Sequence, residues 1–250
     1  MATVAALWRH PIKSHGREAM ESLQLVPGQT IANDRRWAVV HDASSYDLSA
    51  PQWAPCQHFM RGSRTPALAA TRAQCWADQV ILTHPRLGEI SFDPDDPADA
   101  ARFIDWITPL CPAGHARPRA VVRVEGRGMT DTDYPSVSLI NHASHDAVAS
   151  RIGRPLEAER WRANIWLAGI SPWAETAWPG QRLRIGEAEL LIREPIQRCL
   201  HTAANPQTGE RDADTLGALE ILTGTRDFGV YAEATSAGTI RTGDVASIIG

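Results

Sequence analysis

The chain has 250 residues, of which 43% are hydrophobic and 22% are charged. This length and composition are typical of a globular protein with a sizeable core, in one large domain or two smaller ones. The 29 acidic residues outnumber the 25 basic ones, and the net charge of −4 argues against a protein that binds nucleic acid phosphates. All basic residues but one are arginine, so any amine chemistry would depend on Lys13.

Four cysteines are spread along the chain: Cys56, Cys75, Cys111 and Cys199. Their spacing does not match a zinc site, a disulfide framework or an iron–sulfur ligand set. No window approaches the roughly 18 apolar residues of a membrane span, and the first residues lack the apolar run of a secretory signal. These features predict a cytoplasmic protein with reduced thiols and no membrane association.

Short stretches of high β-propensity, separated by turn residues, dominate the first hundred residues. Strands are predicted at 3–9, 21–26, 36–41 and 79–83. Residues 43–66 show no hydrophobic period and are predicted to form a loop. Asp96 and Pro97 mark the start of a helix over 98–108, whose apolar residues recur at helical spacing.

Residues 109–118 are rich in Pro and Gly and are predicted to link a domain of residues 1–115 to one of residues 116–250. In the second part, strands are predicted at 120–124, 137–140, 164–168, 182–186, 188–193, 229–235 and 239–248. One helix is predicted at 213–222, and another is expected to be capped by Ser144 and to end at Gly153. Many short strands with few helices predict a mainly β (α+β) fold of barrel-like architecture.

Polar and charged residues stand at the ends of several predicted strands: Lys13, Ser14, Arg35, Arg36, Arg162, Asn164, Arg198 and Cys199. A thiol and several cations that converge from strand ends would form a site for an anionic ligand. The common nucleotide-binding and hydrolase motifs are absent. His142 and His145 stand three residues apart near a predicted helix start and are predicted to be surface or capping residues.

Long, collinear segments of the chain resemble a known family. The opening is similar to the N-terminal β-barrel domain found ahead of MOSC domains: PIKSHGREAMESLQLVPGQTIANDRRWAVV. Two later segments resemble the MOSC domain itself: RANIWLAGISPWAETAWPGQRLRIGEAELLIREPIQRCLHTAANPQTGERD and DFGVYAEATSAGTIRTGDVASI. MOSC domains are named after the C-terminal domain of molybdenum cofactor sulfurases, and they include the amidoxime-reducing component proteins. The resemblance implies an N-terminal MOSC-type β-barrel domain packed on a MOSC β-barrel with a few short helices.

The resemblance also implies a cofactor and its ligands. In reductase-type members, one cysteine thiolate coordinates molybdenum held by the dithiolene of molybdopterin, and Cys199 matches that cysteine as metal ligand and catalytic residue. A soft thiolate suits a thiophilic metal, and the neighbouring Arg198 is expected to favour the ionised thiol. By the same resemblance, the cofactor-binding residues are Lys13, Ser14, Arg35, Arg162, Asn164 and Arg198. The other cysteines, Cys56, Cys75 and Cys111, match no family motif and are expected to be structural.

The sequence departs from the family pattern at three positions. Ala163 stands where proline is common between the Arg and the Asn. Asn33 replaces the usual glycine before Asp34, but asparagine tolerates a left-handed conformation and the turn is expected to survive. His201 stands where a small hydroxyl residue is often seen, in a place to deliver protons.

The implied function is a molybdenum-dependent reductase of N-hydroxylated or other N-oxygenated small molecules. Because the chain carries no iron–sulfur cluster, the electrons would come from an external protein of the ferredoxin, flavin or cytochrome b5 type. The alternative is a non-catalytic module that carries molybdenum cofactor, or sulfur as a persulfide on the same cysteine. The sequence leaves both open. Pyridoxal phosphate is not expected, because Lys13, its only possible attachment point, lies in a segment that matches a molybdopterin-binding loop.

Overall fold

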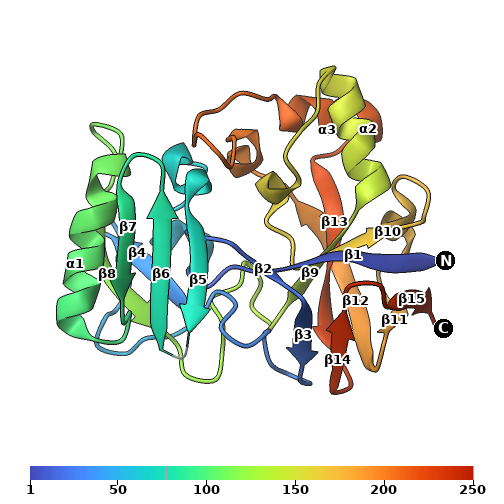
Figure 1. Ribbon diagram of the computed structural model, residues 1–250, viewed down its shortest axis with the longest axis horizontal. Helices are drawn as coiled ribbons and strands as arrows, with labels where there is room; N and C mark the ends of the chain where they lie inside the picture. Colours follow the sequence, from blue (N-terminus) through green and yellow to red (C-terminus); the bar gives the residue numbers. More distant parts are fainter. Residues whose placement is uncertain (77, 250) are drawn as a thin grey trace.

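The computed structural model describes residues 1–76 and 78–249 of the chain (Figure 1). Strands and irregular connections make up most of it, with three α-helices among the described residues. The predicted mainly β class is therefore confirmed. None of the described helices has the length and apolar character needed to cross a lipid bilayer.

Seven strands form a closed barrel, on the right of Figure 1. Their order is β10–β9–β13–β12–β11–β15–β1, and antiparallel pairing of β1 with β10 closes the ring. The short β2 (Glu18–Met20) extends the sheet beyond β1. The barrel strands are β1 (Ala2–Arg9), β9 (Val137–Asn141), β10 (Ile165–Ala168), β11 (Arg182–Ile185), β12 (Ala188–Gln197), β13 (Asp227–Ala234) and β15 (Val245–Ile248).

Aliphatic side chains fill the barrel because inward-facing residues alternate with outward-facing ones. In β11 and β12, the side chains of Leu183, Ile185, Leu190 and Ile192 are buried in the main hydrophobic cluster, whereas the residues between them are more exposed. Burying one such side chain contributes about 1.5–3 kcal/mol. A shift of one residue in register would expose this whole set, so the pattern determines which face of each strand points inward.

A smaller unit lies beside the barrel, on the left of Figure 1. It contains the antiparallel pair β4 (Trp37–His41) and β8 (Pro118–Arg123), the sheet β5 (Arg72–Trp76), β6 (Gln79–His84) and β7 (Gly88–Phe92), and the helix α1 (Pro97–Ile107). Phe92 of β7 stacks on Phe103 of α1, with ring centroids 4.5 Å apart. Two further strands, β3 (Ser22–Leu25) and β14 (Gly238–Arg241), pair with each other. The predicted division of the chain at residue 115 stays a prediction; β1 and β8 both pair with strands from the other side of that position.

Side-chain caps begin the helices, and one of them differs from the prediction. Asp96 caps α1 as expected and accepts hydrogen bonds of 2.9 Å from the main-chain N–H groups of Ala98 and Asp99. The predicted cap Ser144 was wrong: α2 (His142–Ile152) begins directly after β9, and Asn141 is its cap. Gly153 ends α2 in the left-handed conformation, as predicted, and α3 (Thr215–Thr223) lies close to its predicted position.

Three strands, β2, β5 and β7, were not predicted from the sequence, and β2 has only three residues. β5 and β7 are short, and most of their residues are exposed or half-buried. With small or polar residues at most positions, their alternation is too weak to mark a strand.

Candidate functional site

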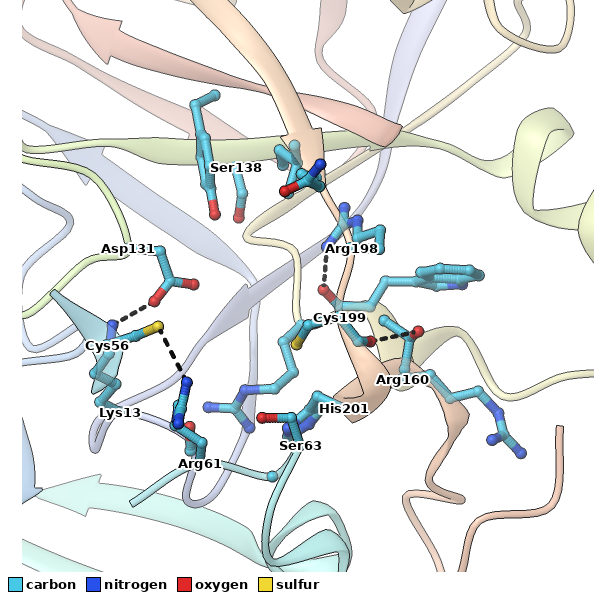
Figure 2. A pocket seen from close by; sticks show the side chains of 18 of the residues that line it. Lys13, Cys56, Arg61, Ser63, Asp131, Ser138, Arg160, Arg198, Cys199 and His201 are labelled. Atoms are coloured by element: carbon cyan, nitrogen blue, oxygen red, sulfur yellow. Dashed lines mark hydrogen bonds and ion pairs between the residues drawn. The ribbon is translucent and has the colours of Figure 1, made fainter. Parts of the chain in front are cut away.

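A cavity of about 370 Å³ opens where the barrel meets the smaller unit (Figure 2). Six of the seven predicted site residues line it, although they lie far apart in the sequence: Lys13, Ser14, Arg35, Arg162, Arg198 and Cys199. The loops after β1, before β4, before β10 and after β12 carry them. The structure thus brings the predicted strand-end residues together in one place.

Backbone conformation at this cavity is unusual. Five non-glycine residues of the described chain have positive φ, and three of them line the cavity: Ser14 (65°), Arg35 (49°) and Arg162 (50°). Such conformations cost L-residues free energy and persist only where surrounding contacts enforce them. Asn33 also has a positive φ of 60°, so the turn before Arg35 survives the replacement of glycine.

Cys199 lies between the end of β12 and a single 3-10 turn, Leu200–Ala203, and is exposed at the cavity wall. The protein that surrounds the cavity raises the pKa of the thiol by partly desolvating it. Arg198 acts in the opposite direction, as expected from the sequence, but does not outweigh this effect. The free protein therefore carries mainly a thiol here, which would lose its proton on binding a metal.

Arg198 is held rigidly beside Cys199. Its Nε donates to the main-chain oxygen of Phe228 at 2.8 Å, and its Nη1 donates to that of Trp161 at 2.9 Å. The guanidinium carbon also lies 5.4 Å from the ring centroid of Phe228 and 5.6 Å from that of Trp161. The remaining nitrogen, Nη2, is buried and has no hydrogen-bond partner in the described part of the chain. Burial lowers the pKa of Arg198 to about 10, so the group stays cationic at neutral pH.

Arg162 presents a second unpartnered nitrogen. Its Nη1 donates to the main-chain oxygen of Gly16 at 2.8 Å, whereas its Nη2 is buried without a protein partner. Burial, followed by the charges of Arg35 and Arg17, lowers the pKa of Arg162 to about 9. A buried cation that lacks a counter-ion and lies near other cations is stabilised by an anionic ligand.

Arg35 is paired within the protein. It forms a salt bridge with buried Asp34, and its Nη2 donates to the main-chain oxygen of Arg162 at 3.0 Å. Burial alone would raise the pKa of Asp34, but Arg35 and hydrogen bonds from His10 outweigh it and hold that pKa well below its usual range. Arg35, held in place by the ionised Asp34, thereby positions the loop that carries Arg162 through its hydrogen bond to the main chain of that loop.

Asn164 is the one predicted site residue that does not line the cavity. It is completely buried, and its side-chain oxygen accepts hydrogen bonds from the Ser138 hydroxyl at 2.8 Å and from Arg35 at 3.3 Å. Its amide nitrogen donates to the main-chain oxygen of Trp8 at 3.2 Å. Asn164 therefore supports the cavity wall from behind, and its predicted contact with a cofactor stays a prediction.

Lys13 already has three protein acceptors. Its ammonium donates to the main-chain oxygens of Met129 at 2.9 Å and Thr130 at 3.2 Å, and it forms a salt bridge with Asp131. Burial would raise the pKa of Asp131, but Lys13 outweighs this and lowers it to about 2. Lys13 thus anchors residues 129–131 at the cavity and keeps an ionised carboxylate there.

Other lining residues were missed by the sequence reasoning: Cys56, Arg61, Ser63, Asp131, Ser138 and Tyr231. Cys56 belongs to the segment with no hydrophobic period, so no pattern placed it near Cys199. The structure shows both cysteines at one cavity (Figure 2). Cys75 and Cys111 lie elsewhere, and burial raises the pKa of both thiols, that of Cys75 to about 12.

The predictions for His145 and His201 need correction. His145 is buried, not on the surface, and its Nδ1 accepts a hydrogen bond of 2.9 Å from the indole N–H of Trp161. His142 packs on the ring of Trp166, with ring centroids 4.5 Å apart. Burial and the nearby Arg162 lower the pKa of His201 to about 3, so His201 is neutral at physiological pH and does not supply protons as an imidazolium.

The residues of this cavity fit a cofactor that contains a soft metal and anionic groups. An exposed thiol is a ligand for a soft metal, and two buried guanidinium nitrogens without partners suit anionic groups on the same molecule. Within the described residues, no three His, Cys, Asp or Glu side chains are grouped as a metal-ligand set. The fold and the site together define a β-barrel protein with an exposed thiol and two unpartnered guanidinium nitrogens, among the described residues, at one cavity.

Comparison with known families agrees with this class. The model of the MOSC N-terminal beta barrel domain matches residues 1–110, and that of the MOSC domain matches residues 129–247. The chain therefore belongs to the MOSC family, in the group that carries both domains.

Curated relatives fall into two groups. Mitochondrial amidoxime-reducing component 1 of Mus musculus is 24% identical, over 100% of this chain and 83% of that protein; the Homo sapiens protein is 23% identical, over 100% and 84%. The molybdenum cofactor sulfurase of Drosophila grimshawi is 35% identical, over 40% of this chain and 14% of that protein. Among solved structures, the YUAD protein from Bacillus subtilis covers 98% of this chain and is itself covered to 94%, with 15% identity and a TM-score of 0.47.

Proposed function

We propose that this protein binds the molybdenum cofactor and reduces N-hydroxylated or other N-oxygenated small molecules. The observation that carries the proposal is the exposed thiol of Cys199 beside the unpartnered guanidinium nitrogens of Arg162 and Arg198 in one cavity. The relatives named amidoxime-reducing component, which align with the whole chain, support the substrate class.

The residues of the site would have different roles in binding the cofactor. Cys199 would coordinate the metal, because a thiolate is a soft ligand. Arg162 and Arg198 would hold the phosphate and pterin oxygens through their free N–H groups, and Ser14 would add a hydroxyl donor. Arg35 and Asn164 would fix the loops that carry these donors. Lys13 would keep residues 129–131 in place and would contact the cofactor only by giving up a present acceptor.

When bound, the molybdenum cofactor supplies the oxygen-atom transfer and the two-electron redox chemistry. The balanced reaction for a hydroxylamine is R–NHOH + 2 e⁻ + 2 H⁺ → R–NH₂ + H₂O. An external electron-transfer protein of the ferredoxin, flavin or cytochrome b5 type would supply the electrons.

Metal and pterin analysis tests the proposal. Protein produced in a host that makes molybdenum cofactor is expected to contain near-stoichiometric molybdenum and to release the oxidised pterin. It should also reduce a hydroxylamine with an artificial reductant. Cys199→Ser should lose this activity, whereas Cys75→Ser, a change of a thiol outside the cavity, should retain it. Metal-free wild-type protein from such a host would refute the proposal.

A second candidate function is sulfur transfer, with a persulfide on Cys199. Its support is Cys56, a second thiol at the same cavity, since sulfur passes between thiols by exchange. The intact mass of freshly isolated protein separates the two functions, because a persulfide adds about the mass of one sulfur atom. Metal-free protein that carries this extra mass would favour the carrier.

A further inference from the structure

One wall of the cavity comes from the smaller unit, in the turn of residues 61–65. The main-chain oxygen of Arg61 accepts from the N–H groups of Arg64 at 3.0 Å and Thr65 at 2.8 Å, which closes the turn. Arg61, Gly62 and Ser63 line the cavity. The turn is fixed against the barrel because Gly62 packs directly on the imidazole of His201, where a Cβ atom would overlap the ring.

Arg61 brings a positive charge to this wall, and no carboxylate of residues 1–76 and 78–249 forms an ion pair with it. Its polar side-chain contact among the described residues is the sulfur of Cys56, at 3.9 Å from Nη1. Two other arginines of the cavity are paired: Arg160 with Glu157 and Asp212, and Arg35 with Asp34. Arg61 is half-buried, so its guanidinium is reachable from the cavity.

The acidic side chains that line the described part of the cavity do not neutralise Arg61. Asp131 is paired with Lys13, and Glu194 accepts a 2.7 Å hydrogen bond from the hydroxyl of Tyr134. Figure 2 shows Cys56 and Arg61 on one side of the cavity and Arg198 with Cys199 on the other. Arg61 therefore offers an unneutralised cation on the side of the cavity away from Arg198 and Cys199.

We infer that Arg61 is a substrate-specificity residue and that the substrate carries a carboxylate. A guanidinium binds a carboxylate through two parallel N–H···O bonds, and the Ser63 hydroxyl on the same wall can donate a third bond. The N-oxygenated end of the molecule would then face Cys199, and its acidic end the 61–65 turn. The inference rests on the proposed function for the reacting group, but the carboxylate site does not depend on turnover.

Calorimetric binding without reductant tests the inference on cofactor-loaded protein. The probes are benzamidoxime and its 4-carboxylate derivative, which differ by one negative charge. Wild type is expected to bind the carboxylate at least about tenfold more tightly, as for a charge-assisted pair. Arg61→Gln should abolish this difference, and Arg64→Gln, in the same turn but outside the cavity, should keep it.

Two results would overturn the inference: equal affinity of wild type for the two probes, or an undiminished preference in Arg61→Gln. A third result, the loss of molybdenum and pterin from Arg61→Gln, would also overturn the inference, because it would assign Arg61 to cofactor binding. If instead the proposed function is wrong, the results differ. The preference for the carboxylate probe then still depends on Arg61, but neither probe is reduced when electrons are supplied.

Discussion

Arg198 donates a 2.9 Å hydrogen bond to the main-chain oxygen of Trp161 and places its guanidinium over the indole ring of the same residue. Trp161 in turn donates its indole N–H to His145 on α2. A chain of contacts therefore runs from a helix outside the barrel to the arginine beside the cavity thiol.

His145→Phe should disturb this chain while keeping an aromatic ring in place. The change leaves the Trp161 N–H and the main-chain oxygen of Leu156 buried without partners, at a cost of about 1–3 kcal/mol each in unfolding free energy. Denaturant unfolding would measure the loss, and phosphate affinity would report on Arg198. The control is His142→Phe on the same helix; equal losses in both variants would contradict the prediction.

Lys13→Met should destabilise the protein and loosen residues 129–131, which Lys13 holds at the cavity wall. The variant leaves the buried main-chain oxygens of Met129 and Thr130 without their donor, at a cost of about 1–3 kcal/mol each, and removes the ion pair with the exposed Asp131 carboxylate. Lys13→Arg keeps the charge, but its planar group does not fit three acceptors around one nitrogen. It is expected to lower cofactor occupancy, measured as molybdenum per chain; full occupancy would show that the ammonium is not required.

Gly62→Ala should force His201 or the 61–65 turn to move, because the new methyl group overlaps the imidazole. Overpacking of this kind costs about 1–3 kcal/mol. His201→Ala removes the obstacle, so the double variant should lose less stability than the sum of the two single variants. Chemical denaturation of all four proteins measures this coupling, and additive losses would show that the two residues do not press on each other.

Stability should fall between about pH 6.5 and pH 4 because of buried His15. Burial lowers the pKa of His15 to about 4, so in this window the unfolded chain binds a proton that the folded protein does not. His15→Gln should therefore lose less stability than wild type as the pH drops through this range. Denaturant midpoints at both ends of the window test this, with exposed His115→Gln as control; an unchanged slope in His15→Gln would disprove it.

Local patterns in the sequence were enough for much of the fold. Alternating aliphatic residues predicted most barrel strands, and the Asp96–Pro97 pair predicted the start of α1, because both signals act over a few residues. The weak strands β2, β5 and β7 and the cap of α2 were not predicted correctly, since their signals are small or compete with those of neighbouring residues.

The candidate site was also predicted in part. Residues at strand ends, together with the resemblance to MOSC domains, selected six side chains that line one cavity. The barrel closure between β1 and β10 explains why they meet, since it joins loops more than a hundred residues apart.

The sequence by itself determined the strands, their inward faces and the set of charged residues at their ends, because side-chain alternation and turn chemistry are local. Only the tertiary structure decided which of those charges are satisfied. Lys13 and Arg35 donate to main-chain oxygens of distant segments, whereas Arg162 and Arg198 each keep a buried N–H group without a partner among the described residues. Burial and long-range pairing determine this outcome, and both depend on contacts that form only when the barrel closes against the smaller unit.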